Sequence, residues 1–384
     1  MSPRALCLAG ALIQTKYRLL KGFPAKNTPL AGKFEIALDG GEGRGVNLKK
    51  LAQELGLSQT TVSRALNGYP EVSEKTRKRV ADAADRLGYR PNVSARRLAT
   101  GRVGAVGVVM ASEGQLLVNP HFSEFLAGLG QRLAADEIDV MVSVRSDELS
   151  AYRQIAADKG VDAMIISTPK PEDERVTLCT KLGLPFIVHG RTRLALPHAW
   201  LDIDNEGAMF AATMHLLDLG HRRIALGNGP SGLMFCELRE LGWKRALMGR
   251  GIVPDARLTV GGEMTDEMGF RFGREMLALR PRPTAFVCGS ITMAIGVFRA
   301  IRAEGLELGR DISMIAHDDV FPYLNADKMF PTMSTTRSSI REAGTRIAEL
   351  LIEMLAGRDP GTIHEEWPIE LIARGSTGPA PKGP

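Results

Sequence analysis

The chain has 384 residues, of which 44% are hydrophobic and 24% charged, and its net charge is +5 at pH 7. This composition is typical of a globular protein with two or three domains, and no apolar run approaches the roughly 20 residues that cross a bilayer. A membrane-spanning protein is therefore excluded. The cysteines are too far apart for a zinc-ligand spacing or a disulfide framework, and we expect thiols in a reducing cytoplasm at Cys7, Cys179, Cys236 and Cys288.

Residues 1–45 show no clear periodicity and end in the glycine-rich run DGGEGRG. The apolar stretch from Ala5 to Ile13 is short and lacks a small-residue cleavage site, which argues against a secretory signal. Two interpretations remain open. The segment is either a disordered arm or an extension read from a start codon placed too far upstream, with Val46 as the true initiator.

Residues 46–91 carry short helical patterns. Apolar residues recur at helical spacing from Leu48 to Leu55, and Gly56 follows where a tight turn is expected. Ser58 is placed to cap a second helix, QTTVSRALN, and Ser73 to cap a third, EKTRKRVADAADRLG. The order helix, glycine turn, helix, loop, helix predicts a small all-α helix-turn-helix DNA-binding domain.

Charge separates this head from the rest of the chain. Residues 46–103 hold 12 Lys and Arg against 5 Asp and Glu, whereas residues 104–384 hold 30 against 36. A basic head indicates a polyanionic partner, although a small helical domain with a solvated basic face is the plain alternative. Side chains on the second helix that would reach base edges are Gln59, Thr60, Ser63 and Arg64. Hydroxyl groups placed to bind phosphates are those of Ser58, Thr61 and Ser73.

From Val103 the pattern changes to apolar strand-like runs separated by amphipathic helical stretches. Such alternation predicts parallel sheets covered by helices on both faces, and about 280 residues are too many for one such sheet, so we expect two lobes. Ligands of these folds bind at the carboxyl ends of the strands. Residues 375–384, rich in Gly and Pro, are predicted to be a flexible tail.

Several segments resemble the lactose-repressor/galactose-repressor (LacI/GalR) family of bacterial transcription regulators. They are TVSRALNG, VSEKTR and LGYRPN in the head, and NPHFSEFLAGL, LDIDNEGA, LGHRRIAL and DISMIAHDD in the body. The resemblance extends from Val46 to Arg374 and is nearest to the rhizobial α-glucoside type. It implies a cytoplasmic, nucleoid-associated homodimer that binds near-palindromic operator DNA. The C-terminal residues show no leucine-heptad helix, so a dimer rather than a tetramer is expected.

The resemblance also implies how the domains are arranged. Residues 104–374 would form an α/β two-lobed, periplasmic-binding-protein-like sensor, with lobe 1 at about 104–204 and 332–341 and lobe 2 at about 205–331 and 342–374. Residues 92–103 would be a hinge helix and linker that fold on the operator, because a helix this short is unstable alone. In that hinge Leu98 matches the apolar wedge that enters the minor groove, and the neighbouring contacts would be Asn92, Ala95 and Arg96.

By the same resemblance, Arg239 and Asp318 match the arginine and carboxylate that bind effector hydroxyls, and Phe122 matches an aromatic that packs on the ligand. An arginine, a carboxylate and an aromatic ring suit a sugar. Met264 and Ser290 depart from the family pattern, which leaves the ligand's identity open. From spacing alone, Arg239 could instead pair with a nearby glutamate. The full set of expected effector residues is His121, Phe122, Thr168, Arg191, Arg239, Met264, Ser290 and Asp318.

An enzyme is the first competing class. The run from Leu226 to Gly232, LGNGPSG, follows a strand but lacks the Lys-Ser/Thr of a P-loop and the spacing of a dinucleotide fingerprint. No nucleophile, base and acid stand in a recognisable order, so we expect no catalysis, no cofactor and no metal. A soluble sugar-binding protein without operator specificity is the second alternative. The sequence favours a sugar-controlled repressor of carbohydrate-utilisation genes with an α-glucoside or related glycoside as effector.

Overall fold

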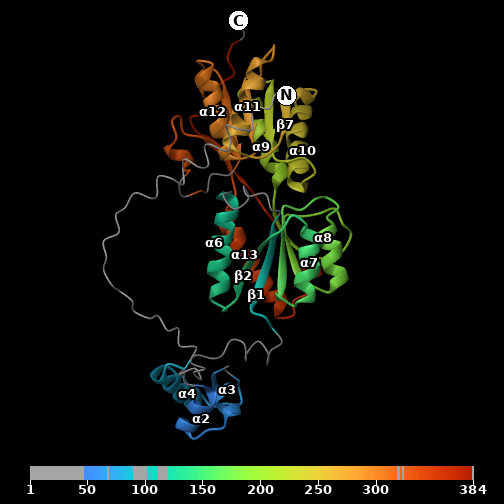
Figure 1. Ribbon diagram of the computed structural model, residues 1–384. Helices are drawn as coiled ribbons and strands as arrows, with labels where there is room; N and C mark the ends of the chain where they lie inside the picture. Colours follow the sequence, from blue (N-terminus) through green and yellow to red (C-terminus); the bar gives the residue numbers. More distant parts are fainter. Residues whose placement is uncertain are drawn as a thin grey trace, which may run out of the picture. The chain divides into compact units, whose positions relative to one another are not determined.

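The computed structural model describes residues 47–66, 69–89, 102–110, 120–317, 321 and 324–382 (Figure 1). The chain divides into two compact units, residues 1–92 and 93–384. No helix within the described residues is long and apolar enough to cross a membrane.

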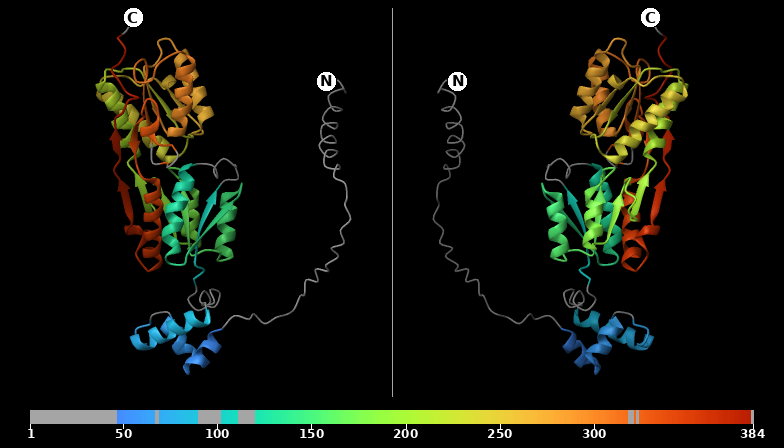
Figure 2. Two further views of the ribbon diagram at one scale, coloured as in Figure 1. Left: turned by 90° about the vertical axis from the view of Figure 1, so that its left-hand side faces the viewer. Right: turned by 90° about the vertical axis from the view of Figure 1, so that its right-hand side faces the viewer.

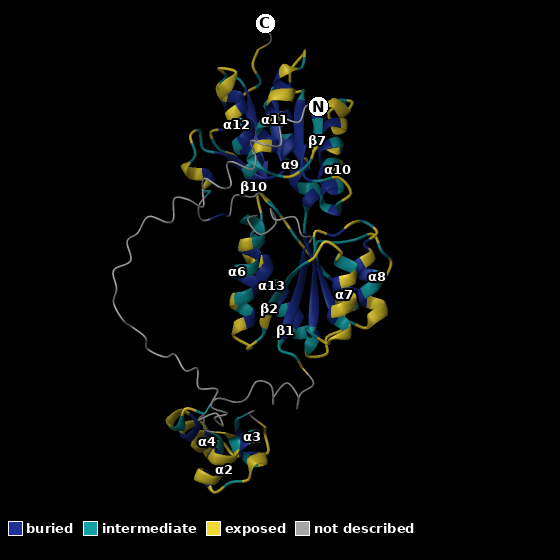
Figure 3. Cartoon of the chain, in the orientation of Figure 1, coloured by how far each residue is buried: buried dark blue, intermediate teal, exposed yellow. Residues whose placement is uncertain are grey.

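The first unit is a three-helix domain built from α2 (Leu48–Leu55), α3 (Gln59–Leu66) and α4 (Glu74–Leu87). Local capping fixes these ends. Gly56 ends α2 in the left-handed conformation with φ 63°, the Ser58 hydroxyl accepts a hydrogen bond from the Thr61 amide at 3.0 Å, and Ser73 caps α4. The inner faces meet in one core, dark blue in Figure 3, formed by Leu51, Ala52, Leu55, Val62, Ala65, Val72, Val80, Ala83 and Ala84. The predicted helix-turn-helix domain is confirmed.

Lobe 1 of the second unit is a parallel sheet with helices on both faces. Its strand order is β11-β5-β4-β3-β1-β2. The strands are β1 (Ala105–Met110), β2 (Asp139–Val144), β3 (Ala163–Ser167), β4 (Phe186–His189), β5 (Ala199–Ile203) and β11 (His364–Trp367). In Figure 1 two helices cover one face, α6 (Pro120–Ala134) and α13 (Ile340–Leu355), and two the other, α7 (Glu148–Ala157) and α8 (Glu174–Leu182). Each face has its own hydrophobic core.

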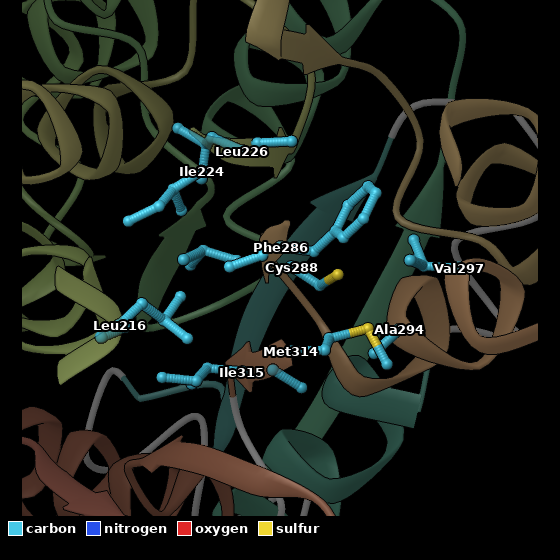
Figure 4. Close-up of a cluster of buried hydrophobic side chains, with 14 of the residues drawn as sticks. Leu216, Ile224, Leu226, Phe286, Cys288, Ala294, Val297, Met314 and Ile315 are labelled. Carbon is cyan, nitrogen blue, oxygen red and sulfur yellow. The ribbon is translucent and has the colours of Figure 1, made fainter. Parts of the chain in front are cut away.

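Lobe 2 repeats this architecture, with strand order β12-β10-β9-β8-β6-β7. The strands are β6 (Ile224–Asn228), β7 (Thr259–Gly261), β8 (Ala285–Cys288), β9 (Ser313–His317), β10 (Ser334–Arg337) and the antiparallel β12 (Glu370–Ile372). Two helices pack on each face: α9 (Asn205–Asp218) with α10 (Met234–Gly249), and α11 (Asp266–Ala278) with α12 (Ile291–Ala303) (Figures 1 and 2). Figure 4 shows Phe286, Cys288 and Ile315 from neighbouring strands in the shared core.

Short 3-10 helices complete the elements of the second unit. They are η2 (Ala256–Leu258) and η3 (Ala326–Lys328) in lobe 2 and η4 (Pro360–Thr362) beside β5 in lobe 1. The cysteines of the described body, Cys179, Cys236 and Cys288, are buried free thiols. Burial raises the pKa of the Cys236 and Cys179 thiols to about 12, so both stay protonated near neutral pH.

Three segments connect the lobes, and we call them the crossing segments: β5 to α9, β10 to α13, and β11 to β12. They correct the predicted lobe boundaries. Residues 332–341 were expected in lobe 1, but β10 pairs with β9 and β12 in the sheet of lobe 2. Within 342–374, expected in lobe 2, α13 packs on α6 and β11 pairs with β5, so both belong to lobe 1. Two late crossings in short strands leave no periodic signal in the sequence.

The C-terminal residues also differ from the prediction. Residues 375–382, expected in a flexible tail, pack against lobe 2. The Ser376 hydroxyl donates to the Met314 carbonyl at 2.6 Å, the Gly378 amide to the Ser313 hydroxyl at 3.0 Å, and the Ala380 amide to the Leu219 carbonyl at 2.8 Å. Gly and Pro disfavour helices, but an extended segment is ordered when its backbone groups find partners.

Candidate nucleic-acid and effector sites

The second helix of the head presents a polar outer face. Gln59, Thr60 and Arg64 are exposed, and Ser63 is half-buried. Val62 and Ala65, on the opposite side of α3, are buried, so they hold the helix on the core while the polar side chains point outward. A helix face that carries Gln, Thr and Arg can donate to and accept from base edges. The four predicted residues therefore share one outer face of α3, from its first residue to its last turn.

The three predicted phosphate-binding hydroxyls lie in helix caps. The hydroxyls of Ser58 and Thr61 contact each other at 2.8 Å, and the Ser73 hydroxyl contacts that of Thr76 at 2.9 Å. Within residues 47–66 and 69–89 the structure gives Arg64 no acidic partner, whereas Arg77 pairs with Glu74 at 3.3 Å. The guanidinium of Arg64 is thus available for an external anion or base. The predicted contacts Asn92, Ala95, Arg96 and Leu98 lie outside the described residues.

A cavity of about 450 Å³ opens at the carboxyl ends of the lobe 1 strands. Three predicted effector residues line it: His121, Phe122 and Thr168. The prediction missed Phe125 and His189, whose rings stack with centroids 4.5 Å apart. Burial, and then the neighbouring His121, lowers the pKa of His189 to about 4, so this ring is neutral near pH 7. The wall is therefore aromatic and uncharged at this point.

Arg175 and Asp173, which form an ion pair, also line the cavity. Arg175 donates to the carbonyls of Ser167 and Thr168 at 3.1 and 3.3 Å, and binds Asp173 through two hydrogen bonds of 2.9 and 2.7 Å. Burial acts to raise the pKa of Asp173, but the hydrogen bonds from Arg175 hold it below its usual range. Thr168 has φ 48°, a conformation that non-glycine residues rarely adopt. The hydrogen bonds from Arg175 thus hold the end of β3, including the strained Thr168 backbone, in place beside the cavity.

Arg239 lies in lobe 2 with only 6% of its surface exposed. Its Nε donates to Asn205 Oδ1 at 2.8 Å, its Nη1 donates to the Gly289 carbonyl at 3.0 Å, and Nη1 is 3.9 Å from the Met264 sulfur. The predicted alternative, a pair with a nearby glutamate, is not formed. Glu237 pairs with Arg193 at 2.8 Å and Glu240 with Lys244 at 2.6 Å.

Two other predicted residues are used within the protein. Ser290 is fully buried, and its hydroxyl caps α12 by accepting from the Met293 amide at 3.1 Å while donating to the Met264 carbonyl at 3.4 Å. Arg191 pairs with two carboxylates: its Nε lies 3.4 Å from Asp202 Oδ2, and its Nη1 lies 2.7 Å from Glu366 Oε1. Neither is among the residues that line the lobe 1 cavity. The predicted Asp318 lies outside the described residues.

Side chains of the two lobes also contact each other directly. The His121 ring of lobe 1 contacts the Phe321 ring of lobe 2 edge-on, with centroids 4.6 Å apart. His317, at the end of β9, shares a 2.8 Å hydrogen bond with the Thr336 hydroxyl. Burial, then the charges of Arg239 and His121, holds the pKa of His317 well below its usual range. His317 therefore lies close enough to Arg239 and His121 for their charges to affect its pKa, and sequence reasoning missed it.

Asp202 carries a pH-dependent effect on stability. Burial raises the pKa of its carboxyl to about 6, against hydrogen bonding from Ile203 and the charge of Arg191. A carboxyl whose pKa is raised on folding stabilises the folded state when protonated, and this contribution is lost as pH rises from about 4 to about 6. We expect the free energy of unfolding of Asp202→Asn, relative to the native chain, to increase by on the order of 2 kcal/mol over that interval and then level off. Urea unfolding at a series of pH values measures it, and a difference that is constant from pH 4 to 7 would contradict the assignment.

The fold defines a class of protein: a helix-turn-helix domain followed in one chain by a two-lobed α/β domain of the periplasmic-binding-protein type. Within the described residues no group of three or more His, Cys, Asp or Glu is arranged to hold a metal ion. The family model for bacterial regulatory proteins of the lacI family matches residues 47–92, and that for a periplasmic binding protein-like domain matches residues 213–377.

Relatives make the assignment specific. The chain is 45% identical to the HTH-type transcriptional regulator AglR of Rhizobium meliloti (strain 1021) over 340 residues, which are 88% of this chain and 95% of the relative. It is 31% identical to the HTH-type transcriptional regulator RafR of Escherichia coli, over 88% of this chain and 99% of the relative. The chain belongs to the LacI family and is a DNA-binding transcriptional regulator, as predicted.

Solved structures agree with this fold. The lac repressor dimer bound to operator and the anti-inducer ONPF has a TM-score of 0.72 and 26% identity, covering 87% of this chain and all of the other. The complex of the transcriptional regulator CelR with cellobiose has a TM-score of 0.64 and 26% identity, covering 86% of this chain and 99% of the other. The predicted two-lobed, periplasmic-binding-protein-like body is therefore confirmed.

Proposed function

We propose that the chain is a cytoplasmic homodimeric repressor of carbohydrate-utilisation genes, and that a neutral glycoside of the α-glucoside type bound between its lobes controls its operator affinity. One observation carries the proposal. The chain that presents Gln59, Thr60 and Arg64 on an exposed recognition helix also brings Arg239 and His121 together at an interlobe cleft. A base-reading element and a ligand cleft in one chain fit a ligand-controlled regulator.

The chemistry of the cleft favours an uncharged sugar. Phe122 and the Phe125–His189 stack provide apolar faces, and Arg239 provides planar donors for hydroxyl groups. Glu148, Glu172, Asp173 and Glu174 outnumber the cations Lys170 and Arg175 around the cavity. This acidic excess disfavours a sugar phosphate. A volume of about 450 Å³ lies within the roughly 300–1,000 Å³ range of small-molecule sites, and the relative CelR has been solved with the disaccharide cellobiose.

The control step follows from the contacts between lobes. Arg193 of lobe 1 pairs with Glu237 of lobe 2, and the Met234 amide donates to the Pro169 carbonyl at 2.9 Å. A ligand that binds one relative placement of the lobes more tightly than another shifts the population between them, and operator affinity shifts by the same coupling free energy.

The first test retrieves genomic DNA fragments with the purified full chain and sequences them. The proposal expects a shared near-palindromic site beside glycoside transport or hydrolase genes. If the retained fragments share no sequence and their retention is salt-sensitive, the assignment as a repressor is overturned. A sugar-binding protein without operator specificity is then favoured.

The second test titrates the operator complex with maltose and with cellobiose, two glucose disaccharides that differ only in the α or β configuration of their linkage. Release by maltose at a concentration at least tenfold below that of cellobiose supports an α-glucoside effector. The reverse order would overturn the α preference, and release by neither would overturn both disaccharides as effectors.

A further inference from the structure

A row of polar side chains, buried at Arg239, Asn205 and Asp202 and exposed at Glu366, leads from the proposed effector site to the crossing segments, and we call it the Arg239–Glu366 chain. Arg239 Nε donates to Asn205 Oδ1 at 2.8 Å, and Asn205 Nδ2 donates to Asp202 Oδ1 at 3.1 Å. Asp202 Oδ2 lies 3.4 Å from Arg191 Nε, and Arg191 Nη1 lies 2.7 Å from Glu366 Oε1. Five side chains thus join α10 of lobe 2 to β11 of lobe 1.

Three of these five side chains, Asp202, Asn205 and Glu366, lie on two of the three crossing segments. Asp202 is on β5 and Asn205 is the first residue of α9, so they lie on either side of one crossing. Glu366 is the partner of Asp202 in the register of β5 with β11, just before the second crossing. The Asp204 amide donates to the Trp367 carbonyl at 2.9 Å, which binds the two crossing segments side by side. A displacement at one segment therefore reaches the other.

Burial makes the arrangement stiff. The exposed fractions of Asp202, Asn205 and Arg239 are 5%, 2% and 6%. A buried polar group without a partner is costly, so each member is held by its neighbours. The Asn205 carboxamide has only one suitable orientation, because its oxygen accepts from Arg239 while its nitrogen donates to Asp202 and to the Ile203 carbonyl at 3.3 Å. Rotating the carboxamide would break all three contacts.

We propose that Asn205 and Asp202 are positioning residues of the effector site, which hold the Arg239 guanidinium and tie its position to the two adjacent crossing segments. In taking Arg239 as an effector ligand, this inference rests on the proposed function. An effector that moves Arg239 by a fraction of an ångström disturbs the hydrogen bond to Asn205, and Asn205 begins the helix that enters lobe 2. Effector binding and lobe placement then share one set of hydrogen bonds.

The first experiment exchanges the two side chains of the central hydrogen bond. Asn205→Asp still accepts from Arg239 but puts a carboxylate against Asp202, whereas combining it with Asp202→Asn removes the repulsion between the two carboxylates and keeps an oxygen that accepts from the Ile203 amide. At pH 8 we expect the single variant to raise the maltose concentration for half-release of the operator at least tenfold, and the combined variant to return within threefold of the native value. A single variant that responds like the native chain, or a combined variant no better than the single one, would overturn the proposal.

A second experiment needs no sugar, so it decides the inference even if the effector is wrong. Hydrogen exchange of the full chain is compared between the native protein and Arg239→Lys, which keeps the charge but not the planar fork. We expect the amides of Ile203 and Asp204 to exchange at least fivefold faster, with those of β8 unchanged. Unchanged exchange at Ile203 and Asp204 would refute the link to the crossing segments.

The matched control is Arg250→Lys. Arg250 is the residue directly after α10, the helix that carries Arg239. It pairs with Asp218, the last residue of α9, whereas Asn205 is the first residue of α9. Its exchange pattern at Ile203 and Asp204 should equal that of the native chain. Faster exchange in the control as well would mean that any lost contact between α9 and α10 loosens this crossing, and the proposal would fail.

Discussion

Replacing Arg239 by alanine should leave the operator complex intact at sugar concentrations that release the native protein. The guanidinium is buried and is held in one orientation by Asn205 and by the Gly289 carbonyl, at the position where the proposed function places ligand hydroxyls. Hydrogen bonds to a charged group contribute about 1.5–3 kcal/mol each. Losing two of them raises the half-release concentration of maltose by about 100-fold or more. Anisotropy of labelled operator, titrated with maltose, measures the shift.

The matched control for this experiment is Arg245→Ala. Arg245 stands on the same helix but is exposed, and it pairs with Glu206 over the Phe210 ring. Surface ion pairs contribute little, so the control should respond within about twofold of the native chain. If Arg239→Ala is released as easily as the native protein, Arg239 is a structural residue and the effector binds elsewhere.

Local signals in the sequence were sufficient to predict the helix ends of the DNA-binding domain. The Gly56 turn and the Ser58 and Ser73 caps are satisfied by atoms three or four residues away, so residue type and spacing determine them. The lobe boundaries near the C-terminus depend on long-range strand pairing. β10 and β11 are four-residue strands whose sheet partners lie far from them in the sequence, and nothing in such a short run specifies which sheet accepts it.

The residues of the proposed effector site were likewise only partly predictable from the sequence. Arg239, His121 and Phe122 were expected from the resemblance; His121 and Phe122 line the lobe 1 cavity, whereas Arg239 is buried in lobe 2. Arg191 and Ser290 were also expected there, but a sequence does not reveal whether a polar side chain at a strand end faces a cleft, a carboxylate or a helix cap. Asp202 and Asn205 were missed, although polar residues at the end of a buried strand and at the start of the next helix are an available signal.

On the DNA side, Gln59→Ala and Lys75→Ala should weaken operator binding in different ways. Gln59 is an exposed, uncharged residue at the start of α3, and its carboxamide can bond an adenine edge at two points. Losing that pair should cost about 1–3 kcal/mol of operator affinity, about 10- to 100-fold, with little effect on unrelated DNA. The salt dependence of binding should be unchanged, because no counterion-releasing charge is removed.

Lys75 lies in the first turn of α4, where a lysine can contact phosphate but not a base edge. Its replacement should weaken binding to operator and to unrelated DNA by similar factors and reduce the slope of log affinity against log salt by about 1. Filter binding to operator and to a scrambled duplex at four salt concentrations separates the two patterns. If Gln59→Ala loses affinity equally for both duplexes, α3 does not read bases at this position. The head would then be a phosphate-binding domain, and operator choice would have to come from another part of the chain.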